Sequence, residues 1–129
     1  MTNEIFTILI AEDEEASRLL YFEELTDEGY RVITAENGLQ VLGALEDEKV
    51  DLLMTDIKMP DMHAMEMIPL VREGHPHLPI LVASAFKGME DDFALKGFNI
   101  NGYYTKPVNI NALKIAIRGL LLEKPSLVA

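Results

Sequence analysis

Three acidic side chains of this sequence follow directly after apolar runs. Glu12 and Asp13 follow residues 8–11, and Asp56 follows residues 52–55. Two carboxylates about 4 Å apart repel each other by about 4 kcal/mol at an effective dielectric constant of about 20, so such a cluster either takes up a proton or binds a cation. Oxygen ligands without a neighbouring histidine or cysteine favour Mg²⁺, which in proteins normally serves a phosphate group.

A hydroxyl group and an ammonium group follow two further apolar runs. Ser84 ends the run 80–84, and Lys106, followed by Pro107, comes after the run 102–105. Beside a bound metal ion, both side chains would act as hydrogen-bond donors to phosphoryl oxygens. The pattern therefore predicts a site for phosphoryl chemistry, provided that the fold brings these strand ends together.

Strand-like apolar runs alternate with helical patterns along the chain. Strands are expected near residues 5–11, 31–35, 51–55, 80–84 and 102–105. Helices are expected near residues 14–28, 38–47, 64–73, 87–97 and 109–122, and the fourth has the weakest pattern. This alternation predicts an α/β fold with a doubly wound parallel sheet, for which 2-1-3-4-5 is one known strand order. The carboxyl ends of parallel strands share one edge, where ligands bind.

Local signals mark several helix ends. Asn37 and Gly38 open the second helix, and Gly29 follows the first at a position suited to a left-handed backbone. Either Asn109 or Asn111 can cap the last helix.

Composition narrows the class of protein. The chain has 129 residues, a formal net charge of -11 and no cysteine. The negative charge argues against nucleic acid and anionic membranes as partners, because their phosphates must be met by clustered cations. Without a basic leader, a long apolar segment or cysteines, the sequence predicts a cytoplasmic protein. Residues 1–122 are expected to form one domain, with residues 123–129 as a tail or linker stub.

The sequence resembles the receiver domain of two-component response regulators over residues 5–122. Together the motifs are specific, although each one alone is weak. They are Glu12-Asp13, Thr55-Asp56-Ile57-Lys58-Met59-Pro60, Ser84-Ala85 and Tyr103-Tyr104-Thr105-Lys106-Pro107. The resemblance implies a flavodoxin-like (βα)5 fold with the strand order 2-1-3-4-5. It also implies that a face formed by helix four, strand five and helix five changes conformation on phosphorylation.

The resemblance implies a role for each acid of the site. Asp56 would accept a phosphoryl group from a histidine kinase or a phosphotransfer protein, with Mg²⁺ (or Mn²⁺) as cofactor. Asp13 would bind the metal directly and Glu12 through water, while Asp56 and the backbone carbonyl of Lys58 would complete the protein ligands. The domain would not be an enzyme with a separate substrate, although it would assist its own phosphorylation and slow autodephosphorylation.

The other matching residues concern the phosphoryl group and the switch. Lys106 would pair with phosphoryl oxygens, and its peptide bond to Pro107 would be cis. Ser84 and the backbone of Ala85 would hydrogen-bond the phosphoryl group, and Tyr103 would rotate inward when Ser84 moves. The signal would pass to a downstream output protein or to an effector domain absent from this sequence. Homodimerisation through the switching face is a further hypothesis.

Four positions depart from the family pattern. Glu12 stands where aspartate is more usual, and His63 and Ala64 replace the usual aspartate and glycine of the loop after the proline. A left-handed backbone at position 64 would cost alanine about 1 kcal/mol. Asn99 replaces a glycine, but asparagine tolerates left-handed geometry. These departures concern metal affinity and the lifetime of the phosphoryl group.

Three other functions fit parts of the pattern. A haloacid-dehalogenase-like phosphatase also uses a strand-end aspartate and Mg²⁺, but Lys58 occupies the place of its second acid. A flavin-binding electron carrier shares the sheet order, but residues 12–15 are all acidic and would repel its phosphate. A constitutive docking module that works without phosphorylation remains as an alternative, and the complete set of site residues argues against it.

Overall fold

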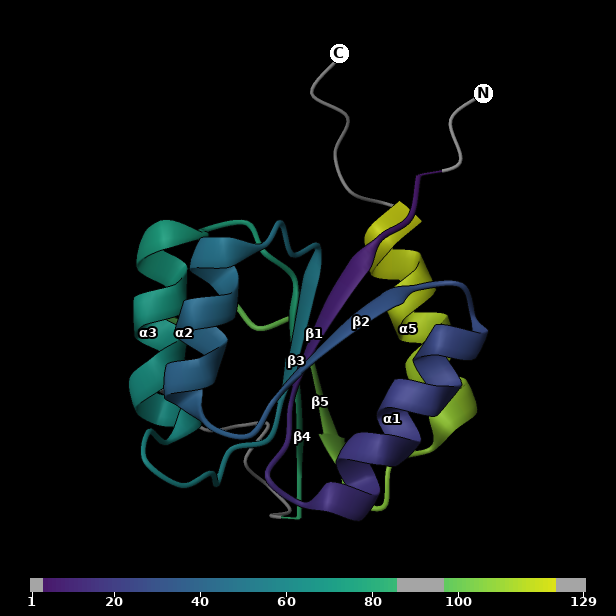
Figure 1. Ribbon diagram of the computed structural model, residues 1–129, viewed down its shortest axis with the longest axis horizontal. Coiled ribbons are helices and arrows are strands. Elements are labelled where there is room, and N and C mark those ends of the chain that lie inside the picture. The colour runs from purple at the N-terminus through teal and green to yellow at the C-terminus, as the bar shows by residue number, and fades with distance from the viewer. Residues whose placement is uncertain (1–3, 86–96, 123–129) are drawn as a thin grey trace.

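The computed structural model describes residues 4–85 and 97–122. The strands are β1 (Thr7–Ala11), β2 (Arg31–Ala35), β3 (Leu52–Thr55), β4 (Ile80–Ser84) and β5 (Gly102–Thr105). The helices are α1 (Glu15–Asp27), α2 (Gly38–Asp47), α3 (Ala64–Gly74) and α5 (Ile110–Leu122). The strands pair in parallel in the order β2-β1-β3-β4-β5, which confirms the predicted doubly wound sheet (Figure 1).

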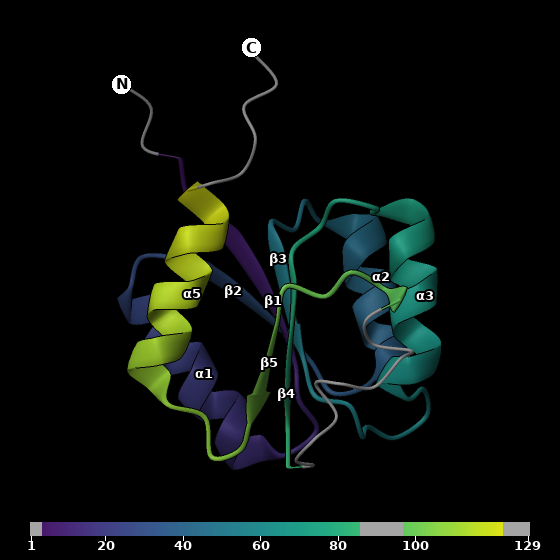
Figure 2. The same cartoon turned by 180° about the vertical axis from the view of Figure 1, so that it is seen from behind.

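Helices cover both faces of this sheet. As Figure 1 and Figure 2 show, α1 and α5 lie on one face and α2 and α3 on the other. In β1, Leu9 belongs to the apolar cluster under α2 and α3, whereas Ile8 and Ile10 belong to the cluster under α1 and α5. A strand buried on both faces needs a continuous apolar run, which is the pattern that the sequence shows. None of the described helices is long and apolar enough to cross a membrane.

The predicted helix ends have the expected local contacts. The side chain of Asn37 accepts a hydrogen bond (2.8 Å) from a backbone N–H in the first turn of α2. Asn109, and not Asn111, caps α5, because its side-chain oxygen accepts a hydrogen bond (3.0 Å) from a backbone N–H of that helix. Gly29 has φ 94°, the left-handed geometry predicted for it.

The helix predicted over residues 87–97 falls almost wholly on residues 86–96, which lie outside the described residues. The segment that follows is tied to the end of α3. Arg72 donates hydrogen bonds to the carbonyl oxygens of Phe98 (2.7 Å) and Asn99 (2.9 Å). Asn99 has φ 55°, so it adopts the left-handed geometry that asparagine tolerates.

The loop between β3 and α3 does not strain Ala64. Within the described residues the left-handed position of this loop is Asp61 (φ 66°), while Ala64 is buried as the first residue of α3. The loop therefore does not need a left-handed backbone at position 64, because a short polar side chain three residues earlier takes the positive φ. His63 caps α3, since its Nδ1 accepts a hydrogen bond from the backbone N–H of Met65 (3.3 Å).

The first residue of α2 packs directly against this loop. A Cβ atom on Gly38 would lie 2.8 Å from both the Cβ atom and the backbone oxygen of Met62. The side-chain amide of Asn37 also donates to the carboxylate of Asp61 (3.4 Å). The absence of a side chain at position 38 therefore allows α2 to support the loop that follows Asp56.

Gly38→Ala is expected to lower the free energy of unfolding by about 1–3 kcal/mol, because the added methyl group overlaps a backbone atom that cannot rotate away. Urea unfolding measures the change. Gly43→Ala in the same helix is the control, since its Cβ would meet nothing within 4 Å, and it should stabilise the protein by about 0.5–1 kcal/mol. Equal stability of Gly38→Ala and wild type would contradict this prediction, because it would show that the loop around Met62 moves away without loss of stability.

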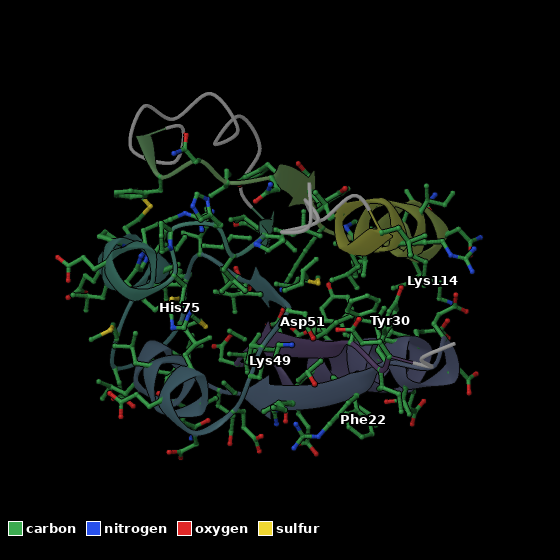
Figure 3. All side chains as sticks on the ribbon, turned by 90° about the horizontal axis from the view of Figure 1, so that it is seen from above. Phe22, Tyr30, Lys49, Asp51, His75 and Lys114 are labelled. Carbon is green, nitrogen blue, oxygen red and sulfur yellow. The ribbon has the colours of Figure 1, made fainter. Side chains whose placement is uncertain are left out.

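Asp51, a buried acid at the amino ends of the strands, serves strand pairing. Figure 3 labels Asp51 at this edge, just before β3. Its carboxylate accepts a hydrogen bond from the backbone N–H of Thr7 (2.8 Å), and its own N–H donates to the carbonyl oxygen of Thr7 (2.8 Å). Asp51 thus joins the segment just before β3 to the first residue of β1, and it takes no part in the acid cluster at the carboxyl edge.

Candidate functional site

Carboxylates from two neighbouring strand ends meet at the carboxyl edge of the sheet. Glu12 and Asp13 follow β1, and Asp56 follows β3, which pairs with β1. One carboxylate oxygen from each of the three acids lies within 4.8 Å of the other two. Glu12 is buried, Asp56 is half-buried and Asp13 is exposed, so the cluster opens to solvent on the side of Asp13.

Lys106 brings an ammonium group into this cluster. Its Nζ lies 2.5 Å from Glu12 Oε1 and 2.8 Å from Asp56 Oδ2. Lys106 follows β5, and its backbone N–H donates to the carbonyl oxygen of Ser84 (2.8 Å). The peptide bond from Lys106 to Pro107 is cis. The side chain therefore extends from the edge strand past β4 to the acids of the two central strands.

The charges in this cluster influence one another. Burial raises the pKa of Glu12, while hydrogen bonds from Lys106 and from the backbone N–H of Glu14 (3.1 Å) act in the opposite direction. Burial acts to lower the pKa of Lys106, but its hydrogen bonds to Asp56 and Glu12 and their negative charges outweigh burial and raise it. The ammonium group therefore stays protonated, and Glu12 and Asp56 share its positive charge.

Hydrogen bonds hold the carboxylate oxygens of Asp56 at the carboxyl edge of the sheet. Its Oδ1 accepts a hydrogen bond from the backbone N–H of Ile57 (2.6 Å) and a longer one from that of Lys58 (3.4 Å), and Lys106 donates to Oδ2. The side chain of Asp56 is 11% exposed. A group in this position is oriented by its neighbours yet can be reached from solvent.

The cluster has the composition of a site for a hard divalent cation. The side chains that could bind a metal are the carboxylates of Glu12, Asp13 and Asp56. The single ammonium group of Lys106 does not balance three carboxylates, so a cation would balance the remaining negative charge. Oxygen-only donors of this kind suit Mg²⁺, which keeps several waters when proteins bind it. The described residues therefore fit the predicted metal.

The predicted switch residues lie on β4 and on its neighbour β5. Ser84 is buried at the end of β4, in register with Thr105 of β5, and Ala85 is exposed. Tyr103 packs against the apolar cluster under α2 and α3, whereas Tyr104 packs against the cluster under α1 and α5. The structure thus separates the two tyrosines by face, and the switching roles of Ser84 and Tyr103 stay predictions.

Arg18 contacts the site but was not predicted from the sequence. Its guanidinium donates hydrogen bonds to the backbone carbonyl oxygens of Glu12 (3.0 Å) and Asp13 (3.2 Å). A signal was present, because Arg18 lies in the first turn of α1, where the helix dipole disfavours a cation. Side chains of a helix also point back toward its N-terminus, which directs Arg18 at the preceding loop.

Fold and site together define a doubly wound α/β domain that carries an acid cluster and a lysine at the carboxyl edge of its sheet. The family model of the response regulator receiver domain matches residues 8–118. The chain belongs to this family, which serves two-component signalling.

Curated relatives include both longer regulators and proteins of similar length. Transcriptional regulatory protein GlrR of Escherichia coli is 34% identical over 110 residues, which are 85% of this chain and 25% of that protein. Sporulation initiation phosphotransferase F of Bacillus subtilis is 28% identical over 114 residues, 88% of this chain and 92% of that protein. The chain thus spans about a quarter of the first relative and nearly all of the second.

Solved structures show the same architecture. Response regulator TrrA of Thermotoga maritima, crystallised in complex with Mg²⁺-BeF, matches with a TM-score of 0.83 and 31% identity, covering 91% of this chain and 100% of TrrA. A CheY-like receiver domain protein of Methanospirillum hungatei matches with a TM-score of 0.87 and 28% identity, covering 93% of this chain and 96% of that one.

Proposed function

We propose that this receiver domain accepts a phosphoryl group on Asp56 from a phosphohistidine of a sensor kinase or phosphotransfer protein, in a reaction that depends on Mg²⁺. The observation that carries the proposal is the position of the Lys106 Nζ, 2.8 Å from Asp56 Oδ2, with oxygens of Glu12 and Asp13 within 4.8 Å of an Asp56 oxygen. Two similar proteins add support, since one is named a phosphotransferase and TrrA was crystallised with Mg²⁺-BeF.

In the transfer, a carboxylate oxygen of Asp56 forms a bond to phosphorus while the bond between phosphorus and the histidine nitrogen breaks. The electron pair of the broken bond stays on the ring nitrogen, which takes up a proton and leaves as neutral imidazole. Phosphoryl transfer asks the protein chiefly for positioning and charge neutralisation. The hydrogen bonds from Ile57 and Lys106 to Asp56 supply the positioning (2.6 and 2.8 Å).

The acids of the cluster would hold the metal. Asp13, Asp56 and the backbone carbonyl of Lys58 would bind Mg²⁺ (or Mn²⁺), and Glu12 would bind through water. The bound cation would neutralise charge on the phosphoryl oxygens. Lys106 would pair with another of these oxygens, and slow hydrolysis of the aspartyl phosphate would reset the domain.

The phosphoryl group would then bias the conformation of the neighbouring strand ends. It adds about -1.5 to -2 charges and three strong acceptors, to which Ser84 and the backbone of Ala85 would donate. Movement of Ser84 would leave space for Tyr103, and the altered face around β5 and α5 would signal to an output partner or pair two copies of the domain. A complete reversal of a two-state equilibrium needs about 5.5 kcal/mol of differential interaction.

Asp56→Asn is expected to abolish phosphorylation, because the amide lacks the nucleophilic carboxylate oxygen. The domain is incubated with Mg²⁺ and acetyl phosphate, and intact mass spectrometry detects the added group. The wild type should gain one phosphoryl group, whereas Asp56→Asn should gain none. Asp61→Asn, in the same loop, is the matched control and should be modified like the wild type.

Two further observations complete this test. Removal of Mg²⁺ by a chelator should suppress the modification in the wild type and in Asp61→Asn alike. A wild-type mass that stays unchanged with acetyl phosphate and with a histidine kinase would reject the proposal and favour a docking module that works without phosphorylation.

A further inference from the structure

We propose that Arg18 is a positioning residue that holds the turn between β1 and α1 in the shape in which Asp13 and Glu12 bind a divalent cation. This inference rests on the proposed function and goes beyond it. It assigns a role to a cation whose hydrogen bonds go to backbone carbonyl oxygens of the acid pair.

The contacts of Arg18 are with the main chain of the acid pair. Its Nη1 donates to the carbonyl oxygens of Glu12 (3.0 Å) and Asp13 (3.2 Å), and its side chain is 19% exposed. Its Nη2 lies 3.9 Å from an oxygen of Glu36, whose side chain is 59% exposed. The exposed ion pair is weak, so the two carbonyl contacts are the main interactions of the guanidinium group.

These two carbonyls control the direction of the Asp13 side chain. One belongs to the peptide unit before the Asp13 Cα atom and the other to the unit after it. Fixing both units relative to one rigid guanidinium group sets the direction of the bond from Cα to Cβ. The side chain of Glu12 is held separately by Lys106 (2.5 Å) and by the N–H of Glu14 (3.1 Å). Exposed Asp13 therefore depends on its backbone for its orientation.

If Arg18 acted through its charge alone, its removal would change the Mg²⁺ affinity in the opposite direction. A positive charge beside the cluster repels an incoming Mg²⁺, so its removal should tighten metal binding on electrostatic grounds. Arg18 also lies in the first turn of α1, where the helix dipole disfavours a cation. Weaker Mg²⁺ binding after removal of Arg18 is therefore explained by lost positioning and not by lost charge.

Arg18→Gln is expected to raise the dissociation constant for Mg²⁺ about tenfold, the lower end of the range for residues that orient metal ligands. Arg18→Lys keeps the charge but places it on a shorter and more flexible side chain, so it should recover only part of the affinity. Isothermal titration calorimetry of the full chain with MgCl₂ measures both. Arg31→Gln is the control, because Arg31 forms an exposed pair with Glu48 (2.9 Å), and its Mg²⁺ affinity should equal that of the wild type.

The outcomes separate this proposal from the proposed function. Normal Mg²⁺ binding by the wild type with unchanged or tighter binding by Arg18→Gln would overturn the positioning role alone. A wild type that binds no Mg²⁺ would overturn both. Circular dichroism and urea unfolding without metal show whether Arg18→Gln is folded. If it is not, Arg18→Lys decides, and wild-type affinity in that variant would overturn the proposal.

Discussion

Lys106→Met is expected to lower the free energy of unfolding by about 3 kcal/mol at neutral pH without Mg²⁺. The substitution removes the ammonium group that Glu12 and Asp56 share at 2.5 and 2.8 Å. Removing one partner of a buried ion pair costs about 3–5 kcal/mol, because it leaves an uncompensated charge. The side chain of Lys106 is 19% exposed, which places the expected loss at the low end of that range.

The loss in free energy of unfolding caused by Lys106→Met should become smaller as the pH falls. Burial already raises the pKa of Glu12 in the folded protein above its ordinary value of 4.5, and loss of the ammonium group raises it further. A raised folded pKa means that the folded state binds the proton more readily than the unfolded chain. The stability that the proton contributes is complete below the unfolded pKa and is lost as the pH rises through the folded pKa.

Urea unfolding of wild type and variant at about pH 7 and about pH 5 measures both effects. Lys114→Met is the control, since Lys114, labelled in Figure 3, joins α5 to α1 through a 2.7 Å contact with Glu24, whose side chain is 38% exposed. Such an exposed pair contributes little to stability. Equal losses in the two variants, independent of pH, would show that Lys106 is an ordinary surface lysine.

The second large effect concerns the metal. Mg²⁺ at about one hundred times its dissociation constant should raise the free energy of unfolding of the wild type by about 2.7 kcal/mol. Asp13→Asn exchanges a charged ligand for a neutral one while keeping its shape. We expect at least a tenfold loss of affinity, which at the same Mg²⁺ concentration reduces the stabilisation to about half or less.

Thermal or urea unfolding with and without MgCl₂ measures this response. Asp47→Asn, an exposed acid at the end of α2, controls for the loss of one negative charge and should respond to Mg²⁺ like the wild type. A full Mg²⁺ response in Asp13→Asn would place the cation elsewhere. No Mg²⁺ response in the wild type would remove the metal from the proposed function.

Much of the fold follows from local signals. The order of strands and helices is encoded in apolar runs and helical spacing, and the helix ends at Gly29, Asn37 and Asn109 depend on residues close in sequence. The placement of acids after the apolar runs also predicted which edge would carry the site, because the carboxyl ends of parallel strands share one edge. For these features, neighbouring residues already contain the physical cause.

Contacts between distant residues decided the remaining details. Lys106 meets Glu12 and Asp56 across separations of 94 and 50 residues, and no local pattern shows that Glu12 would be the buried acid and Asp13 the exposed one. The positive φ fell on Asp61 instead of Ala64, in a loop that also packs against Gly38 of another helix. Packing of separate elements sets burial, loop shape and charge proximity, so only the tertiary structure could assign them.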